Sequence, residues 1–181
     1  MIPLLPLDEA IRRGQQVGLD DRFSSLNAFR VMLHSSRAAG AVAELLRTLM
    51  FHNTLDARAR ELVILRNGWR TRSEYEFCQH VRVSRDLKMS DEEILGVRDP
   101  GNCRAYSEID RAVIRMADEL LDKSEVSAVT WTTLQKSFSN EQLVELLLVA
   151  GFWRMIAGYL KTAQVPLDAG VPSWPEGKAP V

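Results

Sequence analysis

Apolar residues recur at three- and four-residue steps along most of this chain, and this spacing is the feature that most restricts its fold. Side chains three or four residues apart share one face of an α-helix, so the pattern favours amphipathic helices over strands. Glycine is scarce, with 10 residues among 181, and most of the prolines lie near the two ends. Because few helix-breaking residues interrupt the middle of the chain, the sequence predicts an all-α fold.

The length and the end segments of the chain suggest a single domain. A chain of 181 residues can bury one substantial core but is short for two independent ones. We therefore expect one domain over residues 1–181, in which residues 1–20 form an N-terminal helical extension. The Pro/Gly-rich segment 165–181 should be an irregular C-terminal tail.

Polar residues at characteristic positions mark the expected helix starts. Asp8 should cap the first helix, and Thr54 or Asp56 should cap the helix of the segment TLDARARELVILRNGWRT. Ser73 followed by Glu76 fits the S-x-x-E capping box, in which each side chain bonds the backbone N–H of the other residue. Capping is therefore one interpretation of Glu76, and it can coexist with a functional one.

One helix should lie inside the core. Its side chains are apolar on nearly every side from Leu62 to Leu65, and a helix that is apolar all round is usually buried. Glu61 directly precedes this run. It would either favour the first turn of the helix through the helix dipole or serve as a catalytic group.

Charge and composition narrow the possible partners. The net charge of -1 and the pI near 6.3 argue against a nucleic-acid partner, because no basic surface is available to neutralise phosphates. Glu145 and Arg154 interrupt the longest apolar run, and the N-terminus lacks a signal-peptide pattern, so we expect a soluble cytoplasmic protein. Its two cysteines, Cys78 and Cys103, should then be reduced thiols, and they do not form a C-x-x-C motif.

The segment RSEYEFCQHVRVSRDL contains the most informative polar residues. Glu76 and His80 are four residues apart, so a helix places them on one face. Cys78 is two residues from each, about 200° around an ideal helix, and shares its face with Arg82 and Arg85. The helical phase therefore turns Cys78 away from the Glu76 and His80 pair.

The stretch RELVILRNGWRTRSEYEFCQHV resembles the carboxymuconolactone decarboxylase and AhpD-like alkylhydroperoxidase superfamily. The core of that superfamily carries a Glu and then C-x-x-C-x-x-x-H on the next helix. The Glu corresponds to Glu61, the two cysteines to Ser73 and Glu76, and the His to His80. Because a thiolate attacks the hydroperoxide in the peroxidase branch, the loss of both sulfurs argues against that activity here.

The decarboxylase branch of the superfamily fits better. Its pattern YEW..H is similar to YEFCQH at residues 75–80. The segment AGFWRMIAGYLKTAQVPLD is similar, more weakly, to the last helix of the family, but Phe152 and Trp153 follow its glycine where the family often has a polar residue or a histidine. The resemblance implies an AhpD-like helical bundle that assembles as a homo-oligomer, as a dimer, trimer or hexamer.

The implied reaction is cofactor-independent acid/base chemistry on a small anionic organic acid or lactone, by decarboxylation or isomerisation. It needs proton transfer and a pocket that tolerates an anion, but no metal or other cofactor. His80 is the candidate proton donor, and Glu61 or Glu76 is the candidate base or orienting group. The resemblance to the decarboxylase branch thus leads us to expect a lyase.

Other residues could form the substrate pocket. Arg66 could bind a substrate carboxylate with its two-pronged guanidinium, or equally could pair with a surface acid. Trp69, Tyr75 and Trp153 could line the pocket, although aromatic residues of this kind usually belong to the core or to an interface.

Three alternative functions remain open from the sequence. Cys78 could be the nucleophile of an AhpD-like peroxidase if the neighbouring arginines lowered its pKa. Glu61, Glu76 and His80 could instead chelate a metal such as iron or zinc. Finally, the chain could be a helical oligomer without catalytic activity, with His80 as an ordinary core or interface histidine.

Overall fold

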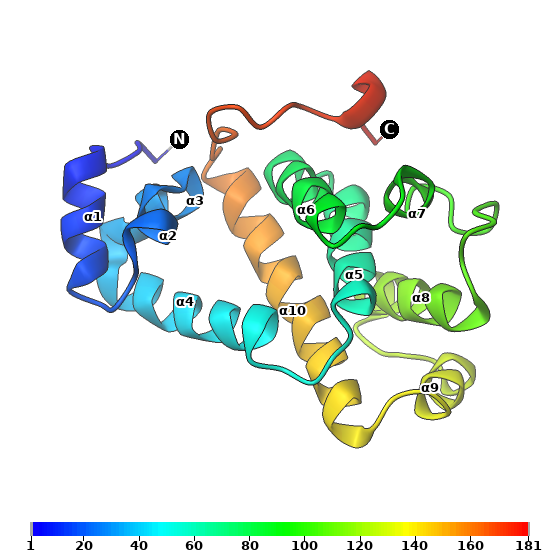
Figure 1. The fold of residues 1–181 in the computed structure, drawn as a ribbon. Coiled ribbons are helices and arrows are strands. Elements are labelled where there is room, and N and C mark those ends of the chain that lie inside the picture. Colours follow the sequence, from blue (N-terminus) through cyan, green and yellow to red (C-terminus); the bar gives the residue numbers. More distant parts are fainter. Residues whose placement is uncertain (1, 181) are drawn as a thin grey trace.

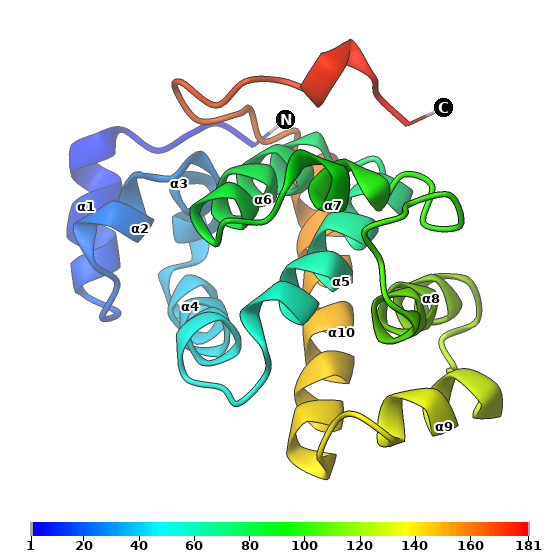
Figure 2. The same ribbon diagram turned by 45° about the vertical axis from the view of Figure 1, so that its right-hand side comes forward.

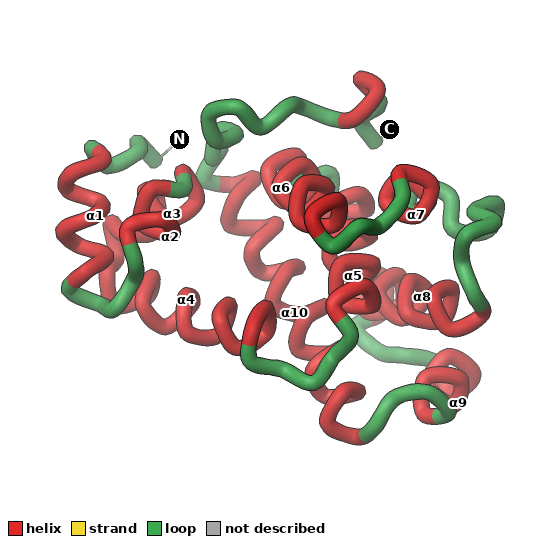
Figure 3. The backbone as a smooth tube through the Cα atoms, viewed as in Figure 1, coloured by secondary structure: helices red, strands yellow, loops and turns green. Residues whose placement is uncertain are grey.

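The computed structural model describes residues 2–180, and this part of the chain is folded into helices and loops without strands, as Figures 1 and 3 show. The predicted all-α class is therefore confirmed. The α-helices are α1 (Leu7–Gln15), α2 (Asp21–Ser25), α3 (Asn27–Met32), α4 (Ser36–Phe51), α5 (Ala57–Arg70), α6 (Glu74–Asp86), α7 (Asp91–Gly96), α8 (Glu108–Lys123), α9 (Ala128–Gln135) and α10 (Asn140–Thr162). Two 3₁₀ turns, η1 (Leu33–Ser35) and η2 (Pro175–Gly177), complete the fold.

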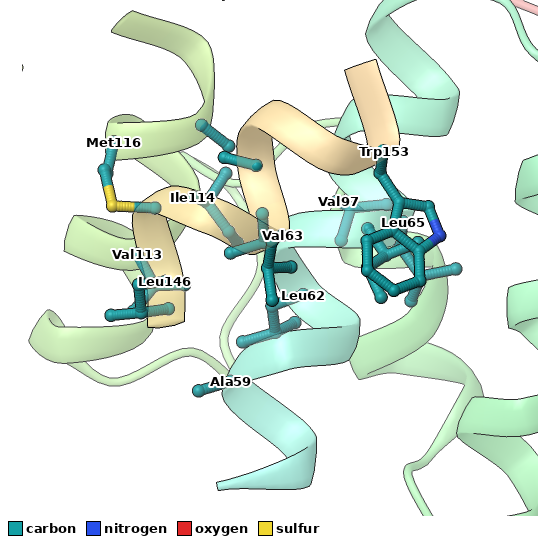
Figure 4. Close-up of a cluster of buried hydrophobic side chains, with 14 of the residues drawn as sticks. Ala59, Leu62, Val63, Leu65, Val97, Val113, Ile114, Met116, Leu146 and Trp153 are labelled. Atoms are coloured by element: carbon teal, nitrogen blue, oxygen red, sulfur yellow. The ribbon is translucent and has the colours of Figure 1, made fainter. Parts of the chain in front are cut away.

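Helix α5 forms the centre of the larger core and packs against α6, α8 and α10. Its residues 62–65 are fully buried, which confirms the predicted buried helix. Side chains of α5, α8 and α10 meet in the cluster drawn in Figure 4, where Leu62 and Val63 lie with Val113 and Leu146. Burial of each such side chain is worth about 1.5–3 kcal/mol, so this cluster is a major source of stability.

A smaller cluster joins the N-terminal helices to the start of α4. Leu5, Ala10 and Phe29 are among its buried members, and α1 packs against both α2 and α4. In Figures 1 and 2 these helices form one end of the molecule, beside α10. The single domain over residues 1–181, with residues 1–20 as an N-terminal extension, remains a prediction. Within this extension, α1 packs against α2 and α4.

The start of α1 differs from the prediction. The helix begins at Leu7, so Asp8 lies inside the first turn and is not the cap. Pro6 occupies the capping position, and its carbonyl accepts from Ala10 N at 2.9 Å. Proline cannot cap through a side chain, but its fixed φ leads the chain into the helix, and Asp8 still stabilises the positive end of the helix dipole.

The other predicted caps had different outcomes. Asp56 caps α5, because its Oδ2 accepts from Ala59 N at 3.0 Å. The capping box at the start of α6 is wrong: Ser73 is at the cap position, but its Oγ has no partner among the described residues. Glu76 instead turns toward α5. Its carboxyl group is therefore not explained by helix capping.

The C-terminal tail is irregular from Val165 to Pro180 except at η2, as predicted for this part of the chain. Figures 1 and 2 show it running across the end of the bundle near α6. Asp168 fixes its first part: one carboxylate oxygen accepts from Tyr75 Oη at 2.5 Å and from Gln79, and the other accepts from Asn27 N at 2.7 Å. The tail thus connects α3 with α6.

Helix α10 is the one helix among the described residues with the length and hydropathy of a membrane span, contrary to the expectation that no segment would qualify. Of the relevant window, 44% is buried inside the fold. The helix packs against α5, α6 and α8, which is the arrangement of a core helix. The apolar composition of α10 fits this packing. The cytoplasmic location of the protein remains a prediction.

Candidate active site

Helices α5 and α6 are held close together, and this contact positions most of the predicted site. A Cβ atom at Gly68 of α5 would lie 3.1 Å from Phe77 N and 3.2 Å from Phe77 Cα of α6. A larger residue at position 68 would therefore push the two helices apart. The glycine allows side chains on α5 to reach those on α6.

His80 on α6 is joined to Glu61 on α5. The distance from His80 Nδ1 to Glu61 Oε2 is 2.7 Å, and Glu61 is completely buried. The second Glu61 oxygen accepts from Arg60 Nε at 3.1 Å, while Arg60 Nη1 donates to the Met50 carbonyl. The predicted association of Glu61 with His80 is present, with a buried arginine behind the carboxylate.

The other ring nitrogen of His80 contacts Trp153 on α10. The indole Nε1 of Trp153 lies 3.0 Å from His80 Nε2, and the two rings meet edge to face with centroids 5.5 Å apart. An indole N–H can only donate, so Nε2 must accept and the ring proton must be on Nδ1, where Glu61 receives it. The hydrogen bonds therefore fix one neutral tautomer of His80.

Glu76 has a different environment from the one predicted. Its Oε1 accepts from Asn67 Nδ2 at 2.8 Å, and its Oε2 has no partner among the described residues although the residue is only 2% exposed. Burial raises the pKa of Glu76 well above its ordinary value, and the single hydrogen bond from Asn67 opposes this only in part. Burial therefore favours the protonated form of Glu76, and Oε2, which has no partner among the described residues, is the oxygen that can carry the proton.

Arg66 and Trp69 have other partners. Arg66 forms a two-pronged ion pair with Asp118, at 2.7 and 2.9 Å, and donates to the Val97 carbonyl. Of the two possibilities for Arg66, pairing with an acid is the one that the structure shows. Trp69 packs against Phe77 and the tail residue Trp174, with the guanidinium of Arg98 above its ring.

The remaining residues predicted to line the pocket, Tyr75 and Trp153, are both buried and hydrogen-bonded to other side chains. Tyr75 is buried and bonded to Asp168, which ties it to the tail. Trp153 is 3% exposed and contacts His80, as described above. Figure 4 shows its indole at the edge of the core cluster.

Cys78 is a core residue. It is 2% exposed, and burial together with the nearby Glu74 carboxylate raises the pKa of its thiol to about 12. The alternative in which neighbouring arginines lower the pKa of Cys78 is therefore not supported, because Arg82 and Arg85 are exposed to solvent while Cys78 belongs to the core cluster. Cys78 and Cys103 are both free and buried.

The possible metal ligands do not converge. Within residues 2–180, no three side chains of the His, Cys, Asp and Glu types are placed to hold one ion. Glu61 faces His80, but the carboxyl group of Glu76 faces Asn67. The three-ligand arrangement that the sequence left open is therefore not formed.

Two residues of the site were not identified from the sequence. Asn67 holds Glu76 and Arg60 supports Glu61, and both are almost fully buried on α5. A detectable signal was present, since each is a polar residue beside the longest all-round apolar stretch of the chain. Such residues are buried only when they have a specific partner.

Comparison with known proteins agrees with this fold. Residues 37–119 match the carboxymuconolactone decarboxylase family. No curated protein matches the sequence significantly. Together with the solved structures described next, the family match confirms the predicted similarity to the carboxymuconolactone decarboxylase and AhpD-like superfamily.

Three solved structures have the same fold. A protein of unknown function from Agrobacterium tumefaciens, described as a candidate antioxidant defence protein AhpD, has a TM-score of 0.70 at 21% identity, covering 75% of this chain and 94% of its own. An uncharacterized peroxidase-related protein from Silicibacter sp. TM1040 has a TM-score of 0.77 at 14% identity, with coverages of 94% and 93%. A cysteine-to-alanine variant of the debrominase Bmp8, in complex with 2,3,4-tribromopyrrole, has a TM-score of 0.75 at 12% identity, with coverages of 93% and 92%. These identities establish a shared fold only.

Proposed function

We propose, from the premise that residues 37–119 are a carboxymuconolactone decarboxylase-family region, that this protein is a cofactor-independent acid/base enzyme. Its substrate would be a small anionic organic acid or lactone, and its reaction a decarboxylation or isomerisation. The observation that carries the proposal is the pairing, on one helix, of a neutral His80 oriented by Glu61 with a buried Glu76 whose Oε2 has no partner in the described chain.

The hydrogen bonds favour roles opposite to those assigned from the sequence. His80 Nε2 accepts a hydrogen bond and carries no proton, so it suits a base more than a donor. Burial raises the pKa of Glu76 and favours its protonated form, so Glu76 suits the acid. Groups whose environments separate their protonation states in this way are typical of acid/base pairs.

A decarboxylation would use Glu76 as its proton donor. The bond from the substrate carbon to its carboxylate breaks, carbon dioxide leaves, and the electron pair moves into the conjugated carbonyl system. Glu76 then delivers its Oε2 proton to carbon and regains a proton from water. In an isomerisation, His80 Nε2 would remove a proton from the carbon beside the carbonyl group, and Glu76 would deliver its proton to another carbon of the conjugated system. A proton then passes from His80 back to Glu76 through solvent. His80 Nε2 is available for this step only after the Trp153 indole N–H has moved away from it.

The test measures carbon dioxide release and product formation by purified protein of known metal content. The substrates are carboxymuconolactone and a series of β-keto and unsaturated lactone acids. We expect turnover of at least one substrate, unchanged by chelator and unchanged in Cys78→Ser. No turnover of any substrate, or hydroperoxide consumption that is lost in Cys78→Ser, would contradict the proposal and support the peroxidase alternative.

We also propose that the protein forms a homo-oligomer through the exposed face of α10. Val144, Leu148 and Met155 are 56%, 49% and 51% exposed, and their spacing places them on one side of the helix. Large apolar side chains grouped in this way usually mark a contact surface. With a net charge of only -1, two copies would repel each other little.

Oligomeric state can be measured by sedimentation. We expect wild-type protein to sediment as a dimer or larger assembly, and Leu148→Glu to shift it toward the monomer because a carboxylate would be buried in the contact. Val129→Glu on α9, whose residue is 76% exposed outside this face, is the matched control and should leave the assembly intact. A monomeric wild-type protein at micromolar concentration would refute this proposal.

A further inference from the structure

A cavity of about 210 Å³ lies between α5, α8 and α10. These three helices lie together in both Figure 1 and Figure 2. The walls are mostly apolar and include Ala117, Leu120, Leu121, Leu147, Ala150 and Gly151. Small-molecule sites usually measure about 300–1,000 Å³, so this cavity would accept only a small ligand.

Two polar residues that could bind a ligand, Asn67 and Arg154, line the cavity. Asn67 belongs to its lining, and the Asn67 amide also donates to Glu76. The cavity therefore reaches the residue that holds the proposed acid. Arg154 also lines the cavity and brings a guanidinium to it.

The guanidinium of Arg154 has donors available for a ligand. Its Nη1 donates to the Leu120 carbonyl at 2.9 Å and lies 3.5 Å from Ser124 Oγ. Within residues 2–180 no carboxylate forms an ion pair with it. Because a guanidinium has five N–H donors in a planar fork, those on Nε and Nη2 remain for an anion.

We propose that this cavity binds the substrate as a small carboxylate, with the carboxylate on Arg154, the unsaturated body against the leucine and alanine walls, and the reacting end toward Asn67 and Glu76. The inference rests on the proposed function, because it names the substrate class and the entry side of that same site. It assigns anion binding to Arg154. Arg66 is not available for this role because its guanidinium is already paired with Asp118.

Two glycines on α10 provide a matched pair of variants. A Cβ atom at Gly151 or at Gly158 would have nothing within 4 Å, so neither position opposes a larger side chain. Gly151 lines the cavity and Gly158 does not. Both Gly151→Leu and Gly158→Leu also remove a glycine from a helix interior, so both should fold.

The experiment measures binding of sorbate, a short unsaturated carboxylate, and of its neutral amide to the full-length protein by calorimetry. We expect wild-type protein to bind sorbate at least about tenfold more tightly than the amide, because the charged contact is lost in the amide. Gly151→Leu should weaken sorbate binding about tenfold or more, and Gly158→Leu should not. Arg154→Leu should remove the preference for sorbate, while Arg82→Leu, which replaces an exposed arginine on α6, should retain it.

The outcomes separate this inference from the proposed function. Absence of sorbate binding, or binding that Gly151→Leu and Arg154→Leu leave unchanged, would overturn the cavity assignment even if turnover depends on His80. Sorbate binding that these two variants abolish would uphold the assignment, and it would do so even if no substrate in the series reacted, in which case only the catalytic proposal would fail. Sedimentation of each variant shows whether a change in assembly accounts for the loss.

Discussion

In the His80→Ala and Glu61→Gln variants we expect kcat on a substrate that is isomerised to fall by a factor of about 10²–10⁴, the usual contribution of an acid/base group, with KM little changed. His80 would lose the accepting nitrogen itself. Glu61→Gln would place an amide where a carboxylate now accepts from both His80 Nδ1 and Arg60 Nε. Since an amide has one oxygen and one NH₂ group, two donors must then face each other at one of these contacts.

A matched variant separates orientation of His80 from simple loss of an ion pair. Arg60→Gln removes the charge partner of Glu61 but leaves the contact between Glu61 and His80 intact. We expect this variant to retain most of the activity. Equal losses in Arg60→Gln and Glu61→Gln, with both proteins folded, would show that the buried ion pair matters and the orientation of His80 does not.

Nitrogen NMR of the histidine rings reports directly which ring nitrogen of His80 carries the proton. His80 should carry its proton on Nδ1 in the wild-type protein and lose this preference in Glu61→Gln. His34 is an internal reference of the opposite kind, because its Nε2 lies 2.9 Å from the Pro3 carbonyl, which can only accept. A protonated Nε2 on His80 in the wild-type protein would contradict the proposed arrangement.

Replacement of Glu76 by glutamine should stabilise the protein at neutral and alkaline pH. Because burial raises the pKa of Glu76, the folded protein holds this proton to a higher pH than the unfolded chain, which ionises Glu76 near its ordinary pKa of 4.5. The folded state therefore binds more protons, so its stability is complete below about pH 4.5 and falls as pH rises toward the raised pKa. The loss can reach about 1.4 kcal/mol per pH unit, and Glu76→Gln should lack it.

Urea unfolding at several pH values between mildly acidic and mildly alkaline tests this sign. The free energy of unfolding of Glu76→Gln, relative to wild type, should increase as the pH rises. Glu119→Gln is the control. Burial raises the pKa of Glu119, but hydrogen bonds from Ser127 and Thr130 lower it by more, so that it stays below its ordinary value. That group is ionised in both states above about pH 5, so its difference should be constant. A constant difference for Glu76→Gln as well would mean that Glu76 is ionised in the folded protein.

The sequence by itself determined the helical class and the position of the central buried helix. The three- and four-residue spacing of apolar residues defines helices without knowledge of their neighbours, and the all-round apolar run of α5 identified the central helix. The resemblance to the carboxymuconolactone decarboxylase and AhpD-like superfamily also implied that Glu61 and His80 belong together, and the structure shows their hydrogen bond. The helical phase predicted that Cys78 points away from Glu76 and His80. In the structure Cys78 belongs to the hydrophobic core cluster, while Glu76 bonds Asn67 and His80 bonds Glu61.

Only the tertiary structure decided what each polar group contacts. Helical phase gives the face on which Glu76 lies, but its partner Asn67 depends on the close approach of α5 and α6 at Gly68. The pairing of Arg66 with Asp118 joins residues 52 positions apart, and that of Trp153 with His80 joins residues 73 apart. Hydrogen bonds act over about 3 Å, so the relative placement of whole helices selects the partner, and with it which group holds the proton.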